Sequence, residues 1–536
     1  MTTLLLLGAT LLLLPLPQAK PATLMPGLGN YHHAIHTASP LAQKFFDQGL
    51  NLYYGFNHDE AIRAFEQAAQ LDPKSPMPVW GKSLSLGRNY NRDEEPELEK
   101  AAYEALQKAQ QLAANAPQNE RDYVAALAAR YSPDPKADHK QLARAFKDAM
   151  GDLVRRYPDD LDAATLYAEA AMNLRPWQLW NHDGTPAEGT LEIIAVLESV
   201  LRRDPMHPGA NHFYIHAVEA SPNPERALPS AERLQTLVPA AGHLVHMPAH
   251  IYARTGDHDA AATANEKAAA ADRAYIAASG ATGMYPMMYY SHNLHFLVGD
   301  NMMRGDYAGA KAAAEKLVGN VRPHVAMMPM VEAFLPTPIF VELRFQHWNQ
   351  ILAMPAPGKG LLLTNVIWRF GRCTALAATG KVADAEKERD AFEQARKAIP
   401  AEQPFGTLNT SGAVFAVAAA SLDARIAAAR GDRDKSIESW KKAVAAQDAL
   451  NYDEPPDWYY PVRESLGGAL LAANRAAEAE KIFREDLQMN PRNPRSLFGL
   501  AEALKAQQKT ADEAWVRSEF EKAWKHADVK LRAGNL

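Results

Sequence analysis

The chain has 536 residues, more than a single compact domain usually contains. Hydrophobic residues make up 47% of it and charged residues 22%, a balance that predicts a folded chain and excludes a disordered one. The net charge is −6, so no basic surface is indicated, and we expect neither nucleic acid nor an anionic membrane as a partner.

Residues 1–19 have the pattern of a signal peptide. The apolar run from Leu4 to Leu14 is too short to span a bilayer, and Ala19 follows it as a candidate cleavage point. No lipobox cysteine follows, and we expect no later segment to cross a membrane. The pattern therefore predicts a soluble periplasmic or secreted protein whose mature chain begins near Lys20 or Pro21.

Residues 20–39 form an N-terminal extension ahead of the first regular element. The extension contains His32, His33 and His36, which could bind a metal adventitiously. Its terminal position favours a mobile segment instead.

From residue 40 onward, small, aromatic and proline residues recur with a 34-residue spacing that is typical of paired helices. Near the start, positions 8, 20, 24, 27 and 32 of the pattern are Gly49, Ala61, Phe65, Ala68 and Pro73. Near the end, positions 8, 11, 20, 24 and 32 are Gly467, Leu470, Ala479, Phe483 and Pro491. This spacing resembles the tetratricopeptide-repeat family. The resemblance implies an all-α, right-handed superhelical solenoid of antiparallel helix pairs.

Weaker units lie between these two. They begin near Pro208, Gly242, Ser291, Asn365 and Val417. A Gly-Asp turn between the two helices of a unit recurs at 256–257, 305–306 and 431–432. We expect N-terminal repeats over 40–206, central histidine-rich repeats over 207–320 and C-terminal repeats over 321–536.

The whole chain also resembles uncharacterised bacterial secreted tetratricopeptide proteins. The stretches that carry this resemblance are FNHDEAIRAFEQAA, HPGANHFYIHAVEAS and GHLVHMPAHIY. It implies a fold and a location outside the cytoplasm, and it implies no chemistry.

Histidines concentrate in the central units. In three successive units, seven of the nine slots at positions 2, 5 and 9 are histidine: His212, His216, His243, His246, His250, His292 and His295. At 100° per residue, these positions lie within roughly 60° of one another on the first helix of a unit, so they form one stripe. In the tetratricopeptide family this stripe faces the concave groove. Because packed helices lie about 8–10 Å apart, three neighbouring stripes can converge on one or two ions.

The histidines therefore predict a transition-metal site. Imidazole suits copper and zinc, and copper is the better match outside the cytoplasm, with one or two ions. The nearest polar neighbours that could support the ligands are Glu219, Glu169, Asn173, Tyr289 and Met288. A groove for an anionic or peptide ligand and a buried polar network are the two other interpretations.

Residues 273–290 interrupt the histidine units and include the stretch SGATGMYPMMYY at 279–290. Glycine and proline break helix there. The segment could be a lid over the groove, with thioethers that suit Cu(I), or an apolar plug that packs the solenoid.

Two functions of different classes follow. One is a secreted metalloprotein, which could be a copper-dependent oxidative or zinc-dependent hydrolytic enzyme. The other is a non-catalytic scaffold that binds a small molecule, a peptide or a partner protein in its groove. His58 and His258 fall at turns between paired helices, so we do not expect them to be ligands.

Overall fold

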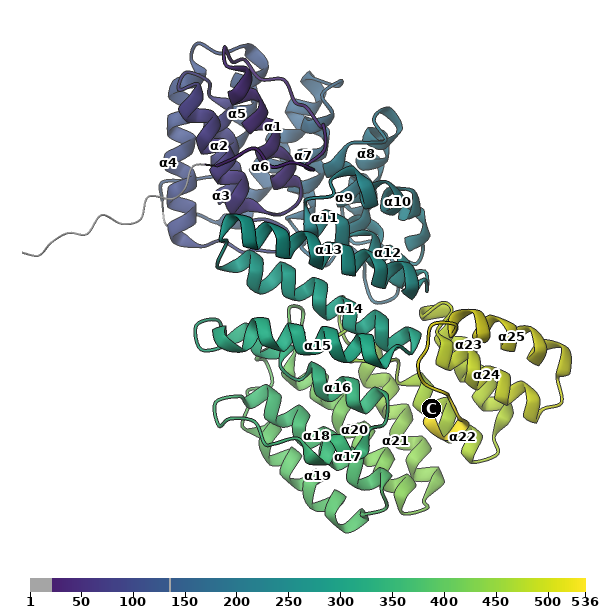
Figure 1. The fold of residues 1–536 in the computed structure, drawn as a ribbon. Coiled ribbons are helices and arrows are strands. Elements are labelled where there is room, and N and C mark those ends of the chain that lie inside the picture. The colour runs from purple at the N-terminus through teal and green to yellow at the C-terminus, as the bar shows by residue number, and fades with distance from the viewer. Residues whose placement is uncertain (1–21, 135) are drawn as a thin grey trace, which may run out of the picture.

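A computed structural model describes residues 22–134 and 136–536 (Figure 1). The predicted signal peptide lies outside the described residues. Helices dominate the described part of the chain, and consecutive helices pack against one another as antiparallel pairs. The prediction of an all-α solenoid of helix pairs is confirmed.

The N-terminal part runs from the purple to the blue helices of Figure 1. Its elements are α1 (Pro40–Tyr54), α2 (His58–Leu71), α3 (Met77–Leu86), α4 (Pro96–Ala113), α5 (Gln118–Ala128), α6 (His139–Arg156), α7 (Leu161–Met172) and α8 (Thr190–Arg203).

The central part is drawn in teal. It contains α9 (Pro208–Val218), η1 (Pro224–Ala227), α10 (Leu228–Leu237), α11 (Gly242–His246), α12 (Pro248–Arg254), α13 (His258–Ser279), η2 (Tyr285–Tyr289), α14 (Tyr290–Arg304) and α15 (Tyr307–Val321).

The C-terminal part is drawn in green and yellow. It contains η3 (Arg322–His324), η4 (Pro329–Phe334), α16 (Thr337–Arg344), α17 (Trp348–Ala353), α18 (Leu362–Ala378), α19 (Val382–Lys397), β1 (Pro404–Phe405), β2 (Asn409–Thr410), α20 (Ser411–Ala429), α21 (Arg433–Asp448), α22 (Arg463–Ala472), α23 (Ala476–Met489), α24 (Pro494–Ala506), α25 (Thr510–Ala523) and η5 (Ala533–Asn535). The two short strands pair antiparallel.

The helix pairs pack as the repeat pattern requires. Phe65 of α2 fills the space between Gly49 of α1 and Gly81 of α3, where an added Cβ would lie 2.6 Å from its ring. Phe483 is placed in the same way between Gly467 and Gly499. Small residues at these positions let neighbouring helices approach closely.

The Gly-Asp turns work through two local effects. Gly256, Gly305 and Gly431 all have φ near +80°, a conformation that favours glycine. The aspartate that follows each glycine caps the next helix, as Asp257 does by accepting from the backbone N–H of Ala260.

The N-terminal extension is fixed against the solenoid, so the expectation of a mobile terminus is wrong for residues 22–39. His33 Nδ1 lies 2.6 Å from a carboxylate oxygen of Asp162 in α7. Gly29 lies close to the backbone of Leu237 at the end of α10. A partly buried ion pair and close backbone packing hold the segment in place. The sequence pattern could not reveal that His33 pairs with a carboxylate of a distant helix.

One helix, α20, is an exception to the expectation that no later segment is long and apolar enough to cross a membrane. Helix α20 is long and apolar enough to cross a membrane by length and composition, with a mean hydropathy of 1.5 in its most apolar window. In the structure, 56% of that window is buried, and the helix packs against α18 and α21. Its apolar character follows from contacts with helices on several sides.

The C-terminal helices return to the middle of the chain. Asp528 accepts hydrogen bonds from the backbone N–H groups of Tyr307 and Ala308 at 2.8 and 2.9 Å. Trp524 packs against Gly305, and Pro491 packs against Gly256. The turns of the central units are therefore covered by the last helix pairs, and a loop from the C-terminal part reaches the histidines.

Candidate metal centre

The seven histidines lie on helices of three neighbouring units. His212 and His216 come from α9, His243 and His246 from α11, His250 from α12, and His292 and His295 from α14. Pro248 lacks an N–H, so it divides the expected single helix into α11 and α12 while the backbone stays helical at Met247. Except for His292 and His295, which are half-buried, these side chains are at most 3% exposed.

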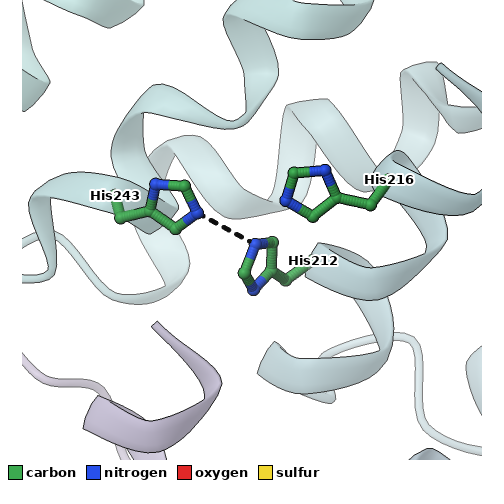
Figure 2. Close-up of side chains that lie close together, drawn as sticks. All are labelled: His212, His216 and His243. Carbon is green, nitrogen blue, oxygen red and sulfur yellow. Dashed lines mark hydrogen bonds between the residues drawn. The ribbon is translucent and has the colours of Figure 1, made fainter. Parts of the chain in front are cut away.

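Six of the seven histidines form two triads. The first triad is His212, His216 and His243, and the second triad is His246, His250 and His292. Within each triad, one ring nitrogen per residue lies within 4.8 Å of the others. Figure 2 shows the rings of the first triad turned toward one another from two helices, with Nε2 of His243 3.1 Å from Nε2 of His212.

The second triad is equally tight. Nε2 of His246 lies 2.7 Å from Nε2 of His250 and 3.0 Å from Nε2 of His292. Two nitrogens that bind one ion at about 2.0–2.1 Å are about 2.9–3.4 Å apart for octahedral to tetrahedral angles. The spacing in both triads is therefore close to that of ligands around one ion.

The opposite ring nitrogens face oxygen atoms. Nδ1 of His246 lies 2.5 Å from Oδ1 of Asn265, whose amide nitrogen donates to Asp300, so the oxygen side of the amide faces the ring. Nδ1 of His212 lies 2.5 Å from the carbonyl oxygen of Tyr54. In their neutral forms both rings carry their hydrogen at Nδ1, and their Nε2 lone pairs point into the triads.

His250 is held by two carboxylates. Its Nδ1 lies 2.6 Å from Glu219 and 2.8 Å from Glu454, although neither contact is aligned as a hydrogen bond. Burial lowers the pKa of His250, but the two carboxylates outweigh burial and raise it to about 10. With a hydrogen at Nδ1, the Nε2 atoms of His246 and His250 can approach to 2.7 Å only with a cation between them, either a proton or a metal ion.

The remaining triad histidines are neutral near pH 7. Burial, together with the neighbouring imidazoles, keeps the pKa values of His212, His243, His246 and His292 well below their usual value. Burial also lowers the pKa of His216, although the Glu219 carboxylate opposes it. Neutral imidazoles are the form that binds a metal.

Glu219 lies between the two triads. One of its carboxylate oxygens lies 2.9 Å from Nδ1 of His216, and the other lies 2.6 Å from Nδ1 of His250. Burial raises the pKa of Glu219, but the two histidines outweigh burial and lower it to about 2.

His295 lies outside both triads. Its ring packs edge-on against Phe334 at 5.3 Å between centroids, and burial lowers its pKa to about 4. Glu169 accepts hydrogen bonds from Tyr53 and from Asn173, so these two expected neighbours bind each other and not a triad histidine.

Residues 273–290 do not form one element. Residues 273–279 continue α13, residues 280–284 form a loop, and residues 285–289 form the π-helix η2. Tyr285 donates to Asp272, and the ring of Tyr289 lies 5.1 Å from that of His243. Met288 lies on the wall of the neighbouring cavity, so the segment forms part of that wall.

A cavity of about 850 Å³ opens beside the triads. Members of both triads reach it, namely His216, His243, His250 and His292. Aromatic and methionine side chains line much of the rest, including Trp177, Tyr289, Phe334, Tyr452, Met288 and Met330. A volume of this size accommodates a small molecule or a short peptide.

The two turn histidines differ in their surroundings. His58 is buried, stacks on Phe56 and meets the ring of Tyr53 edge to face, and neither of its ring nitrogens has a hydrogen-bond partner in the described structure. Nδ1 of His258 lies 3.0 Å from Asp300, the residue that binds the amide of Asn265. His258 is therefore linked to His246 of the second triad through the side chains of Asp300 and Asn265.

Sequence reasoning missed Glu454 and Asn265. Glu454 lies in a 14-residue connection between α21 and α22, far longer than the five-residue and four-residue connections between units at α2–α3 and α23–α24. That excess length, with its acidic and aromatic composition, is the signal that could have marked the loop. Asn265 occupies an ordinary position of α13, and nothing in its sequence context distinguishes it.

Comparisons with known proteins give limited information. No family model matches the chain, and no curated protein matches its sequence. Similar solved structures include the human IFIT1 dimer with m7Gppp-AAAA, at 11% identity over 91% of both chains and a TM-score of 0.33. Yeast Tom70 matches at 11% identity over 90% of this chain and 92% of its own, with a TM-score of 0.32. Cut9–Hcn1 of the APC/C matches at 12% identity over 86% and 76%, with a TM-score of 0.29. TM-scores this low support no argument about the present chain.

Proposed function

We propose that this chain is a periplasmic or secreted metalloprotein that binds copper or zinc through its groove-facing histidines. The observation that carries the proposal is the contact between His246 and His250, where two Nε2 atoms lie 2.7 Å apart. The proton that occupies this position can be exchanged for a metal ion, which would then gain both nitrogens as ligands. The uncharacterised bacterial secreted tetratricopeptide proteins are the group in which we place the chain.

The ligand chemistry fits copper and zinc, and the proposed location outside the cytoplasm favours copper. All the nitrogens that face into the triads belong to imidazole, which suits both metals. Glu219 and Glu454 lie behind the rings, at Nδ1, and so act as partners that orient the histidines. A site whose ligands are all neutral imidazoles suits one or two copper ions.

The cavity supports a role in catalysis. A substrate in it would touch members of both triads, and a metal ion there could serve as an oxidative centre or could activate water for hydrolysis. We therefore propose a metal-dependent enzyme whose substrate is a small molecule or a peptide.

The test is elemental analysis of protein purified without a histidine tag. We expect one or two copper or zinc ions per chain, and we expect chelation to lower the melting temperature because the ion binds only the folded state. Protein that is isolated without metal, and whose melting and spectra do not respond to added copper or zinc, would contradict the proposal.

A second candidate is a scaffold that binds a peptide or partner protein in the cavity without catalysis. The aromatic and methionine lining favours it, because such side chains bind apolar ligands without a metal. In this case the triads would be a buried polar network, and ligand binding would persist after chelation.

A further inference from the structure

The two triads lie next to each other. The rings of His216 and His250, from different triads, have centroids 5.7 Å apart, and those of His243 and His246 are 5.8 Å apart. Within the triads the corresponding separations range from 4.7 to 6.2 Å. The gap between the triads is therefore no wider than the gaps inside them.

We propose that the two triads form one dinuclear centre, in which a single small anionic ligand bridges both ions. This inference rests on the proposed function, since it specifies the number and relation of the ions. Ions in two-metal sites are typically about 3.5–4 Å apart. Rings as close as those of the two triads can place their ions at such a separation.

Glu219 supports the pairing from behind the ligands. Its two carboxylate oxygens hold Nδ1 of His216 in the first triad and Nδ1 of His250 in the second. When one ion orients its histidine, the carboxylate is fixed as well, and the histidine of the other triad loses freedom before its own ion arrives. Loading of the first ion therefore favours loading of the second.

Charge explains why the bridging ligand is an anion. Two divalent ions within a few ångströms repel each other strongly in a buried site. The triad ligands are neutral imidazoles, and the carboxylates in contact with His250 are those of Glu219 and Glu454. A hydroxide or another small anion between the ions reduces this repulsion. The cavity reaches His216 and His243 as well as His250 and His292, so an anion that enters through it meets both positions.

The first experiment uses the full chain, depleted of metal and titrated with copper(II) sulfate. We expect two ions per chain and a weak electron paramagnetic resonance signal, because two copper(II) ions joined by one bridge couple their spins. The integrated signal should be less than about one fifth of that from the same copper after release by chelation. Sodium azide, as a bridging probe, should keep the signal weak and add an absorption band.

Three other results would overturn the inference. Two ions that give the full signal would be separate centres, and a single ion at saturation would mean that no pair forms. Both leave the proposed function standing. No bound copper or zinc would overturn the proposed function together with the inference.

A variant tests the role of Glu219. Glu219→Gln keeps the shape but offers one acceptor oxygen in place of two, so one histidine loses its partner. We expect the second copper ion to bind at least about tenfold more weakly than in the wild type. At one equivalent of copper, the electron paramagnetic resonance signal of the first ion should then appear. The matched control is Glu198→Gln, because Glu198 of α8 accepts hydrogen bonds from Tyr214 and Arg226 and contacts no triad histidine. Equal stepwise affinities in Glu219→Gln and the wild type would contradict the coupling, and circular dichroism would verify that the variant is folded.

Discussion

At the scale of single residues, the centre depends on which nitrogen of each ring carries hydrogen. Oxygen atoms of Tyr54, Asn265 and Glu219 hold Nδ1 of their histidines and turn Nε2 inward. This choice of tautomer makes a group of histidines able to bind metal, since two rings that presented N–H groups to each other could not share an ion.

His246 is the most central of the proposed ligands, because its Nε2 contacts both other members of the second triad. We expect His246→Ala to weaken metal binding more than about 100-fold, beyond the effect of losing an outer hydrogen-bond partner. Metal content after dialysis against a competing chelator measures this loss. His295→Ala is the control, because His295 belongs to neither triad. Equal loss in the two variants would contradict the assignment of the triads.

The raised pKa of His250 predicts how metal binding depends on pH. Below its pKa of about 10 the ring is protonated, so an ion must displace one proton to bind Nε2. Apparent affinity for zinc should therefore rise about tenfold per pH unit between pH 6 and 9 from this group alone. Calorimetric titrations in buffers of different ionisation enthalpy count the protons released.

Glu454→Gln should reduce this pH dependence, because it removes one of the two carboxylates that raise the pKa of His250. An unchanged proton count in that variant would show that Glu454 does not control the protonation of His250.

At the scale of the elements, much of the helix architecture could be predicted from four positions of the repeat, the small residues at 8 and 20, the aromatic residue at 24 and the proline at 32. Gly49, Phe65 and Pro73 define the first pair because each has a packing or backbone requirement that few other residues meet. The stripe of histidines followed from the same frame. The break at Pro248 and the π-helix at 285–289 could not be placed, because both depend on local backbone hydrogen bonding that the repeat spacing does not record.

The close approach of α1, α2 and α3 gives a prediction of stability. Gly49→Ala adds a Cβ 2.6 Å from the Phe65 ring and should lower the free energy of unfolding by about 1–3 kcal/mol. In contrast, Gly319→Ala in α15 meets no neighbouring atom within 4 Å and should raise it by up to about 1 kcal/mol. Urea unfolding of both variants measures the two effects. A stabilising Gly49→Ala would show that the helices can separate freely at this point.

At the scale of the whole molecule, the candidate metal centre is completed by contacts between segments that lie far apart in the sequence. Glu454 comes from a loop between α21 and α22, whereas its partner His250 lies in the central units. Arg254 stacks on Tyr452 of the same loop at 5.5 Å from the ring centroid. The sequence could not predict the contact between this loop and the central units. Repeat spacing shows which units are neighbours along the solenoid, and it does not show which distant segments meet.

Buried carboxyl groups in the C-terminal part predict a dependence of stability on pH. Burial, together with Glu464, raises the pKa of Asp486 to about 7, although hydrogen bonds from Ser496, Asn493 and Asn490 oppose the rise. The folded state then holds this proton at a pH where the unfolded chain has released it. Stability contributed by Asp486 is therefore lost as pH rises from about 4 to about 7.

We expect Asp486→Asn to flatten the fall in melting temperature of chelator-treated protein between pH 5.5 and 7.5. The control is Asp159→Asn, because the Asp159 side chain is 98% exposed. A slope that is the same in all three proteins would contradict a proton on Asp486.

The contact between Glu454 and His250 also has a consequence for biosynthesis. The chain is made from its N-terminus, so all six triad histidines leave the ribosome well before residue 454 does. An early ion would meet a second triad in which His250 is supported by Glu219 alone. Under the proposed function, full occupancy would be reached only after the last helix pairs have closed onto the central turns, so metal content would report completed assembly.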